Sequence, residues 1–287
     1  MTPIRKLQNS HKSSSFQVFK DSIIAKYGLS RICQDIDLIS LRNDKIETLI
    51  EVKTGKEPNN RWKPYIQKYH PDRSINKLDD INYYSLLKLA QALKIRCYLF
   101  RYMKDNLNSG VSIYEISENE NSLNIDFKST RFISQLIGKP NTLSARNQQR
   151  KLLSVKDCHN PNLDPENNLY HRLSQEKALR ERFYIERDGI WTMLISNEKT
   201  FNPLWLYIEI NLDVVEGIDL SKLEEEFFPL VEINQKTQLP LSIIMYREDL
   251  SSLRIFDYTA SGIFKKSGDF SNENLTNFQE AYAKYII

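Results

Sequence analysis

Apolar residues recur at helical spacing in two segments of the first third of the chain. From Phe16 to Tyr27 they follow a run of three serines and stop at Gly28, which predicts an amphipathic helix with a serine N-cap. The same spacing predicts a second helix from about Asp79 to Leu93. Two helices are therefore expected in this part of the chain.

Strand-like runs lie before and after the second helix. Asp35–Leu41 and Ile46–Lys53 flank a polar turn at residues 42–45, which predicts a β-hairpin. Two further β-rich runs, Ile95–Tyr102 and Val111–Ile116, follow the second helix. The order helix, two strands, helix, two strands predicts a mixed α/β domain.

A polar stretch rich in Pro and Asn, from about Pro140 to Asn168, marks the expected domain junction. We therefore expect a first domain over residues 1–139, and a linker with an acidic α+β accessory domain over residues 140–287. The elements expected in the second half are a helix near Leu173–Phe183, strands at Ile190–Ser196 and Leu204–Leu212, a helix near Ser221–Phe228, and strands at Leu241–Tyr246 and Ser252–Tyr258.

Two segments of the chain share one plan. Residues 93–117 and 238–259 each read as a strand, a turn with Tyr and charged residues, and a strand that ends in an acid. Either an internal duplication or coincidence produces such a recurrence. In a duplicated domain, Glu209 and Asn211 would stand in the places of a Glu and a Lys, whereas the alternative makes residues 204–212 a buried core strand.

The composition excludes several classes of protein. With 40% hydrophobic and 27% charged residues, the 287-residue chain has the composition of a globular protein. Its 3 cysteines are too far apart for a Cys-x-x-Cys metal site, and none of its 8 glycines lies in a phosphate-binding glycine loop. Because no apolar run approaches the roughly 18 residues that span a bilayer, we expect a cytoplasmic protein with no membrane partner.

The charge is distributed unevenly along the chain. Residues 1–185 hold 31 Lys and Arg against 20 Asp and Glu, whereas residues 186–287 hold 9 against 17. This asymmetry favours a polyanion such as nucleic acid as the partner of the first part. The alternative is that these cations only solvate exposed helices.

The predicted hairpin brings together residues that carry chemistry. An antiparallel register centred on its turn places Asp37 opposite Glu51 and Asp35 opposite Lys53, with all four side chains on one face. Two facing carboxylates repel each other unless a cation lies between them. Oxygen ligands favour a hard ion, Mg²⁺ or Mn²⁺, and Lys53 beside the ion would orient a water and stabilise a phosphate.

The runs DIDLIS (residues 35–40) and IETLIEVK (residues 46–53), with the helix and strand over residues 81–102, resemble the PD-(D/E)XK nuclease superfamily. The resemblance covers about the first third of the chain. It implies a restriction-endonuclease-like α/β core, a mixed central sheet flanked by helices, in front of the second α+β domain. The proline that usually precedes the first acid in this superfamily is absent here.

The resemblance also implies roles for single residues. Asp37 would be the first metal-binding acid, Glu51 the second and Lys53 the catalytic lysine, and the backbone carbonyl of Val52 would reach the metal. Asp35 is the alternative to Asp37 as the main ligand. The implied activity is a Mg²⁺-dependent endodeoxyribonuclease that leaves 5′-phosphate and 3′-hydroxyl ends, in restriction, phage defence or mobile-element processing. A homodimer or larger assembly is expected on DNA, and RNA is the alternative substrate.

A basic segment with interleaved aromatic residues follows the predicted catalytic strand. Its cations would contact phosphates and its aromatic rings would stack on bases, whereas the alternative is a solvated lid anchored by those rings. The predicted nucleic-acid-binding residues are Lys56, Arg61, Trp62, Lys63, Lys68 and Arg73.

The charges of the hairpin also allow a function without catalysis. The hairpin charges would satisfy one another if Asp35 and Lys53 formed an ordinary cross-strand ion pair. The protein would then be a non-catalytic nucleic-acid-binding or assembly protein on a degenerate nuclease core.

Overall fold

A computed structural model gives the architecture in two compact units. Unit 1 consists of residues 1–35 and 187–287, and unit 2 of residues 36–186. The junction expected at residues 139 and 140 lies outside the described residues. None of the helices that the structure describes is long and apolar enough to cross a membrane. The described residues are 15–28, 31–56, 79–119, 122–132, 135–136, 169, 172–173, 183–185, 189–215 and 217–287.

Unit 1 contains a six-stranded mixed sheet in the order β1-β8-β9-β10-β11-β12. Only β9 and β10 are parallel, and the other neighbours are antiparallel. The strands are β1 (Arg31–Asp35), β8 (Ile190–Asn197), β9 (Pro203–Asn211), β10 (Leu241–Tyr246), β11 (Leu253–Tyr258) and β12 (Phe264–Phe270).

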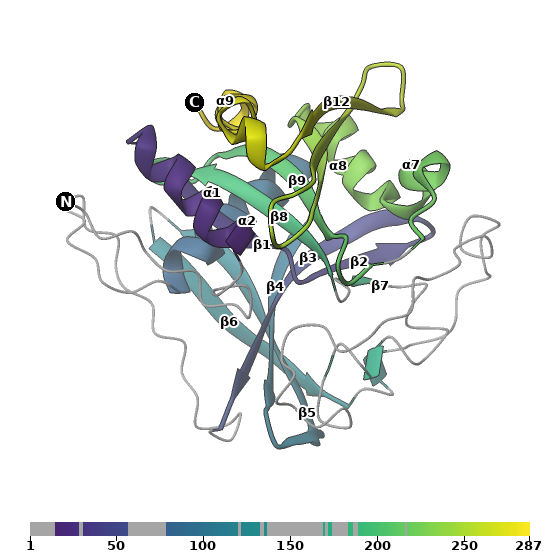
Figure 1. Ribbon diagram of the computed structural model, residues 1–287. Helices are drawn as coiled ribbons and strands as arrows, with labels where there is room; N and C mark the ends of the chain where they lie inside the picture. The colour runs from purple at the N-terminus through teal and green to yellow at the C-terminus, as the bar shows by residue number, and fades with distance from the viewer. Residues whose placement is uncertain are drawn as a thin grey trace. The chain divides into compact units, whose positions relative to one another are not determined.

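Two helices, α1 (Ser15–Lys26) and α9 (Leu275–Ile286), lie side by side on one face of this sheet (Figure 1). The ring of Phe16 on α1 stacks on Tyr246 with 4.0 Å between centroids and meets Phe278 of α9 edge-on at 6.2 Å. These aromatic contacts form the core of unit 1. Its other helical segments are η3 (Leu220–Lys222), α7 (Leu223–Glu226), α8 (Phe228–Thr237) and η4 (Asn272–Asn274).

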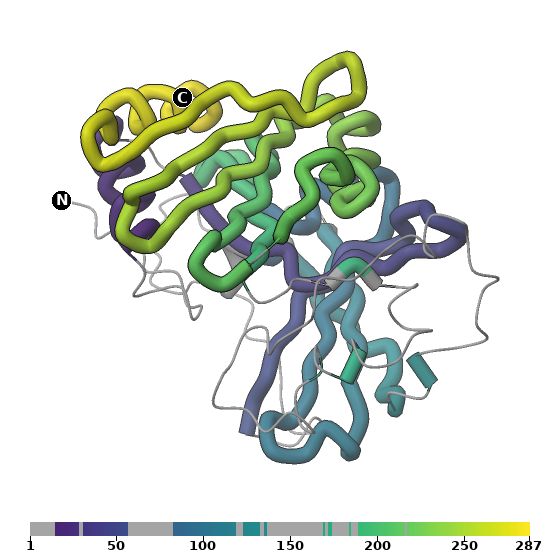
Figure 2. Tube along the Cα trace, turned by 45° about the vertical axis from the view of Figure 1, so that its right-hand side comes forward, coloured from purple at the N-terminus to yellow at the C-terminus, as the bar shows by residue number. Residues whose placement is uncertain are grey.

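Unit 2 contains the second six-stranded mixed sheet, in the order β6-β5-β4-β3-β2-β7. Its parallel pair is β3 and β4, which α2 (Asp79–Leu93) connects. Figure 2 shows β3 running beside the β4–β5 hairpin, where Gly55 pairs with Met103. The strands are β2 (Leu38–Arg42), β3 (Lys45–Gly55), β4 (Arg96–Met103), β5 (Asn106–Asn119), β6 (Ser122–Arg131) and β7 (Phe183–Ile185).

Both units have the same topology. Each sheet contains a hairpin, a parallel crossover through a helix and two further antiparallel strands, namely β2 to β6 in unit 2 and β8 to β12 in unit 1. The recurring segments 93–117 and 238–259 contain β4–β5 and β10–β11, which occupy the same place in the two sheets. The shared plan in the sequence therefore corresponds to a repeated fold.

The two repeats exchange their first strands. β1 precedes β2 in the chain but pairs with β8 in unit 1, and β7 precedes β8 but pairs with β2 in unit 2. The segments that precede these two strands are exchanged in the same way. Phe16, before β1, packs in the core of unit 1, whereas Leu169 and Leu173, before β7, pack in the core of unit 2. Each half of the chain thus completes the sheet formed by the other half.

The predicted hairpin forms, and it has the predicted register from Leu38 to Ser40 but is one residue off beside the turn, where Leu41 pairs with Ile46 and Arg42 with Lys45. Leu38 pairs with Ile50 and Ser40 with Thr48, and the hydroxyl oxygens of Ser40 and Thr48 lie 2.6 Å apart. Asn43 and Asp44 in the two-residue turn have φ angles of 52° and 59°, values that Asn and Asp tolerate better than most residues. A register shift after Ser40 lies between the turn and the candidate site.

One part of the hairpin prediction is wrong. The strand expected over Asp35–Leu41 is interrupted, because β1 ends at Asp35 and β2 begins at Leu38. Asp35 pairs with Met193 in the sheet of unit 1, so it is not opposite Lys53. The physical reason is that β1 takes its partner from the second half of the chain.

Candidate functional site

The candidate site lies where β2 and β3 separate. The β2–β3 ladder ends at the pair Leu38–Ile50, whereas β3 continues to Gly55 along β4. Asp37 directly precedes β2, and its Oδ2 accepts a hydrogen bond of 2.6 Å from the backbone N–H of Val52. Only 7% of Asp37 is exposed. The carboxylate therefore takes the place that the next residue of the ladder would have taken.

Glu51 and Lys53 share one face of β3. Side chains alternate along a strand, and on the opposite face Ile50 belongs to the core cluster and Val52 packs against it. Lys53 Nζ lies 5.2 Å from the ring centroid of Tyr83, which places this face under α2. Val52 lies between Glu51 and Lys53, so Asp37 contacts the main chain between the two predicted catalytic side chains.

Burial shapes the electrostatics of the site. Only 8% of Glu51 is exposed. Burial of the Cys97 thiol on β4 is the main cause that raises its pKa, and the negative charge of Glu51 raises it further. Burial likewise raises the pKa of Tyr102 to about 12, where the Asp37 carboxylate adds to the shift and a hydrogen bond from Leu169 N–H opposes it. Both carboxylates therefore act on groups in the interior of unit 2.

Sequence reasoning missed a cation on the same face. Arg101 is the neighbour of Lys53 across the β3–β4 ladder, and it is only 2% exposed. A Cβ atom added at Gly55 would lie 2.5 Å from Arg101 Nη2, so the glycine leaves room for the guanidinium. The signal in the sequence was a charged residue within the apolar run of a central strand, since such residues are rarely buried without a partner.

The donor set suits a hard cation. Asp37 and Glu51 supply carboxylate oxygens, and the Val52 carbonyl points to the same side of β3 as the N–H that contacts Asp37. Mg²⁺ is commonly bound by one or two carboxylates and keeps several waters. Among the residues that the structure describes, no three His, Cys, Asp or Glu side chains form a group that could hold a metal ion.

The other predicted residues are placed as follows. Asp35 belongs to β1 of unit 1, and Lys56 is exposed directly after β3. The remaining nucleic-acid-binding candidates lie outside the described residues, and they are Arg61, Trp62, Lys63, Lys68 and Arg73.

Glu209 does not repeat the placement of Glu51. It shares with Trp205 and Tyr207 the face that α1 covers, where it forms a buried ion pair with Lys20. The corresponding face of unit 2 is that of Leu169 and Leu173, opposite Glu51. Glu209 therefore belongs to a central core strand of unit 1.

No protein-family model, curated protein or solved structure matches this chain. Its own residues carry the functional argument.

Proposed function

We propose that unit 2 is a Mg²⁺-dependent endodeoxyribonuclease that hydrolyses phosphodiester bonds in DNA. The observation that carries the proposal is the contact of the Asp37 carboxylate with the main chain between Glu51 and Lys53. The contact holds the Asp37 carboxylate at the residue between Glu51 and Lys53, and two acids with a cation are the groups that metal-assisted hydrolysis needs.

Each residue of the site has a chemical task in this proposal. Asp37 and Glu51 would hold the ion, with the Val52 carbonyl beside them. A bound Mg²⁺ would supply Lewis-acid polarisation of the phosphate and lower the pKa of a water. Lys53 orients the attacking water, and the Tyr83 ring fixes the position of its ammonium through a cation–π contact.

Arg101 extends this set of residues. Its guanidinium lies beside Gly55, next to Lys53 in the sheet, and it would stabilise the negative charge that develops on the phosphate. A planar fork of N–H donors suits two phosphate oxygens better than a lysine does.

The charge of unit 2 supports DNA as the substrate. Its residues, 36–186, hold 25 Lys and Arg against 19 Asp and Glu. The excess of cations would attract the phosphate backbone without regard to sequence. A homodimer or larger assembly on DNA is part of the same proposal.

The test is cleavage of supercoiled plasmid and linear DNA by the full chain with Mg²⁺, Mn²⁺ or EDTA. Glu51→Gln and Lys53→Met should each abolish metal-dependent cleavage. Asp126→Asn removes an exposed acid from β6 of the same sheet and should cleave like the wild type. Wild-type activity in Glu51→Gln would refute the proposal, and faster cleavage of RNA would assign an RNA-directed nuclease instead.

One observation favours a second function. Lys53 and Arg101 lie on the face that carries Glu51, so two cations stand near two acids and would balance their charge without a metal. The protein would then bind nucleic acid, or assemble on it, on a degenerate nuclease core. This function would be established if the wild type and both variants, Glu51→Gln and Lys53→Met, bound DNA equally well and none of them cleaved it.

A further inference from the structure

The opposite face of the unit 2 sheet has a pocket of about 840 Å³. Its apolar floor includes the half-buried Tyr98 and Ile113, which pack against the core residues Ile50 and Phe100 on the face opposite Glu51 and Arg101. A hollow of this size accommodates a ligand of one or two nucleotides. Its charged lining consists of Arg42, Glu47, Lys94, Arg96, Lys128 and Arg131.

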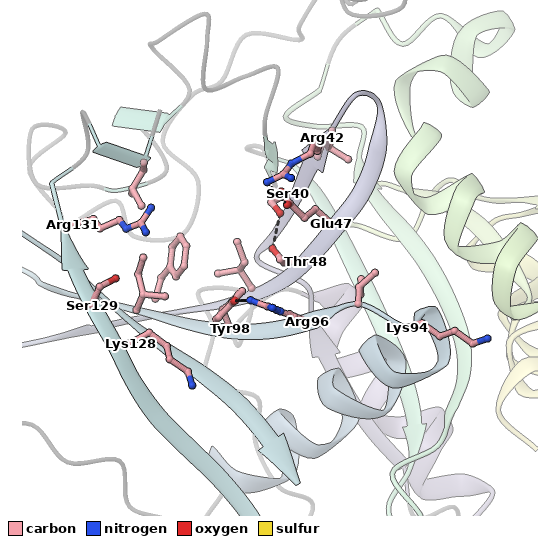
Figure 3. A pocket seen from close by; sticks show the side chains of 16 residues that line it. Ser40, Arg42, Glu47, Thr48, Lys94, Arg96, Tyr98, Lys128, Ser129 and Arg131 are labelled. Carbon is pink, nitrogen blue, oxygen red and sulfur yellow. Dashed lines mark hydrogen bonds and ion pairs between the residues drawn. The ribbon is translucent and has the colours of Figure 1, made fainter. Parts of the chain in front are cut away.

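The lining is strongly cationic. Five of its residues are Lys or Arg and only one is acidic, and that acid, Glu47, is 2.6 Å from Arg42. Glu115 pairs with Lys128 at 2.9 Å. In the part of the chain that the structure describes, Arg131 has no carboxylate partner, whereas the side chain of Lys94 points away from the hollow (Figure 3). The pocket thus has more positive charge than its own acids neutralise.

An aromatic ring lies within this cationic lining. Arg96 Nη1 donates a hydrogen bond of 3.2 Å to the hydroxyl of Tyr98, and both side chains line the pocket. Figure 3 shows Arg42 and Arg131 on opposite sides of the hollow, with Tyr98 beside Arg96 below them. Cations near a partly buried ring provide contacts for phosphates and a surface on which a base can stack.

We infer that this pocket binds a single-stranded segment of nucleic acid. Its cations would contact successive phosphates, and the ring of Tyr98 and the apolar floor would receive an unpaired base. A duplex offers only its backbone to such a hollow, because its bases are stacked and paired inside the helix. A free phosphate would leave the apolar floor without a partner.

This binding is distinct from the proposed cleavage. The two sites lie on opposite faces of one sheet, and the pocket contains no carboxylate pair for a metal among its lining residues. Binding is therefore expected in EDTA, whether or not the protein cleaves DNA.

The test measures fluorescence anisotropy of a labelled oligo-dT of twelve nucleotides with the full chain in EDTA, at several salt concentrations. Arg96→Gln/Arg131→Gln removes two exposed pocket cations, and Lys265→Gln/Lys284→Gln removes two exposed lysines from unit 1 as a charge-matched control. Tyr98→Leu keeps an apolar side chain and removes the ring. A blunt duplex of the same length and dTMP serve as competitors.

We expect the pocket double variant to bind at least about tenfold more weakly than the control. Its slope of log K against log salt should be smaller by about 1.4, since two phosphate contacts are lost. Tyr98→Leu should weaken binding with an unchanged slope. The inference would be overturned if the pocket variant and the control bound equally well, or if the wild type did not bind. It would also be overturned if the duplex or dTMP competed as well as unlabelled oligo-dT.

Discussion

The Oδ2 atom of Asp37 lies 2.6 Å from the backbone nitrogen of Val52, and this contact ties the residue before β2 to β3. It fixes a buried carboxylate beside the strand that carries Glu51 and Lys53. The same contact gives Asp37 a structural task in addition to its proposed role in metal binding, because it satisfies a backbone donor that has left the β2–β3 ladder.

Two substitutions separate the two tasks of Asp37. Asp37→Ala leaves the Val52 N–H without this acceptor and should lower the free energy of unfolding by about 1–3 kcal/mol. Asp37→Asn retains an amide oxygen as acceptor and should cost less. Both should abolish metal-dependent cleavage. Asp37→Ala has no side-chain ligand atom, and the amide of Asp37→Asn is a poor ligand for Mg²⁺ compared with a carboxylate. Urea unfolding and plasmid cleavage provide the two measurements, and an active Asp37→Asn would refute the metal role.

Tyr83 is expected to position Lys53 through its ring. Tyr83→Phe keeps the ring that lies 5.2 Å from Lys53 Nζ and should retain most of the cleavage rate. Tyr83→Leu removes the ring and should lower the rate by about 2- to 30-fold, the equivalent of a cation–π contact of about 0.5–2 kcal/mol. If both variants lose the same fraction of activity, the ring does not position the lysine.

The exchange of first strands makes the two halves of the chain interdependent. A fragment of residues 1–139 contains β2 to β6 but lacks β7, and it contains β1 without β8. Neither this fragment nor residues 140–287 should unfold cooperatively alone, whereas the mixture should recover the far-UV circular dichroism and melting of the intact chain. Cooperative melting of the separate 1–139 fragment would contradict the exchange.

Alkaline pH should destabilise unit 1 through Cys33. Burial raises the pKa of this thiol to about 11, and its Sγ lies 3.6 Å from the Tyr207 hydroxyl oxygen. Between about pH 9 and pH 11 the unfolded chain releases a proton that the folded chain retains, so stability falls as pH rises.

Cys33→Ala isolates this contribution to stability. The difference in free energy of unfolding between wild type and Cys33→Ala, from urea titrations at pH 8 and pH 10.5, should shrink at the higher pH by up to about 1.4 kcal/mol per pH unit. An equal difference at both pH values would show that the thiol has an ordinary pKa.

Local sequence signals accounted for the hairpin and its helix. The hairpin and the pairs from Leu38 to Ser40 were predicted, and α2 has the predicted bounds. The register shift between Ser40 and the two-residue turn at Asn43 and Asp44 was not predicted. The break between β1 and β2 had no local signal, because residues 35–41 read as one strand. It depends on pairing with β8, more than 150 residues later in the chain.

Other elements were missed because their patterns are weak. β12 is a mostly exposed edge strand with two adjacent lysines, and β7 has only 3 residues. Arg101 was missed because an isolated charge within an apolar strand gives no hint of what lies beside it. The guanidinium is placed by Gly55 on the neighbouring strand, which only the parallel β3–β4 register reveals.

The most direct test of the central claim is an anomalous difference map from crystals of the full chain grown with MnCl₂. We expect a manganese peak within about 2.0–2.6 Å of one carboxylate oxygen of Asp37 and one of Glu51, a distance typical of hard cations. The peak should be lost in Glu51→Gln crystals grown under the same conditions. A map with manganese at other sites and none between Asp37 and Glu51 would contradict the account.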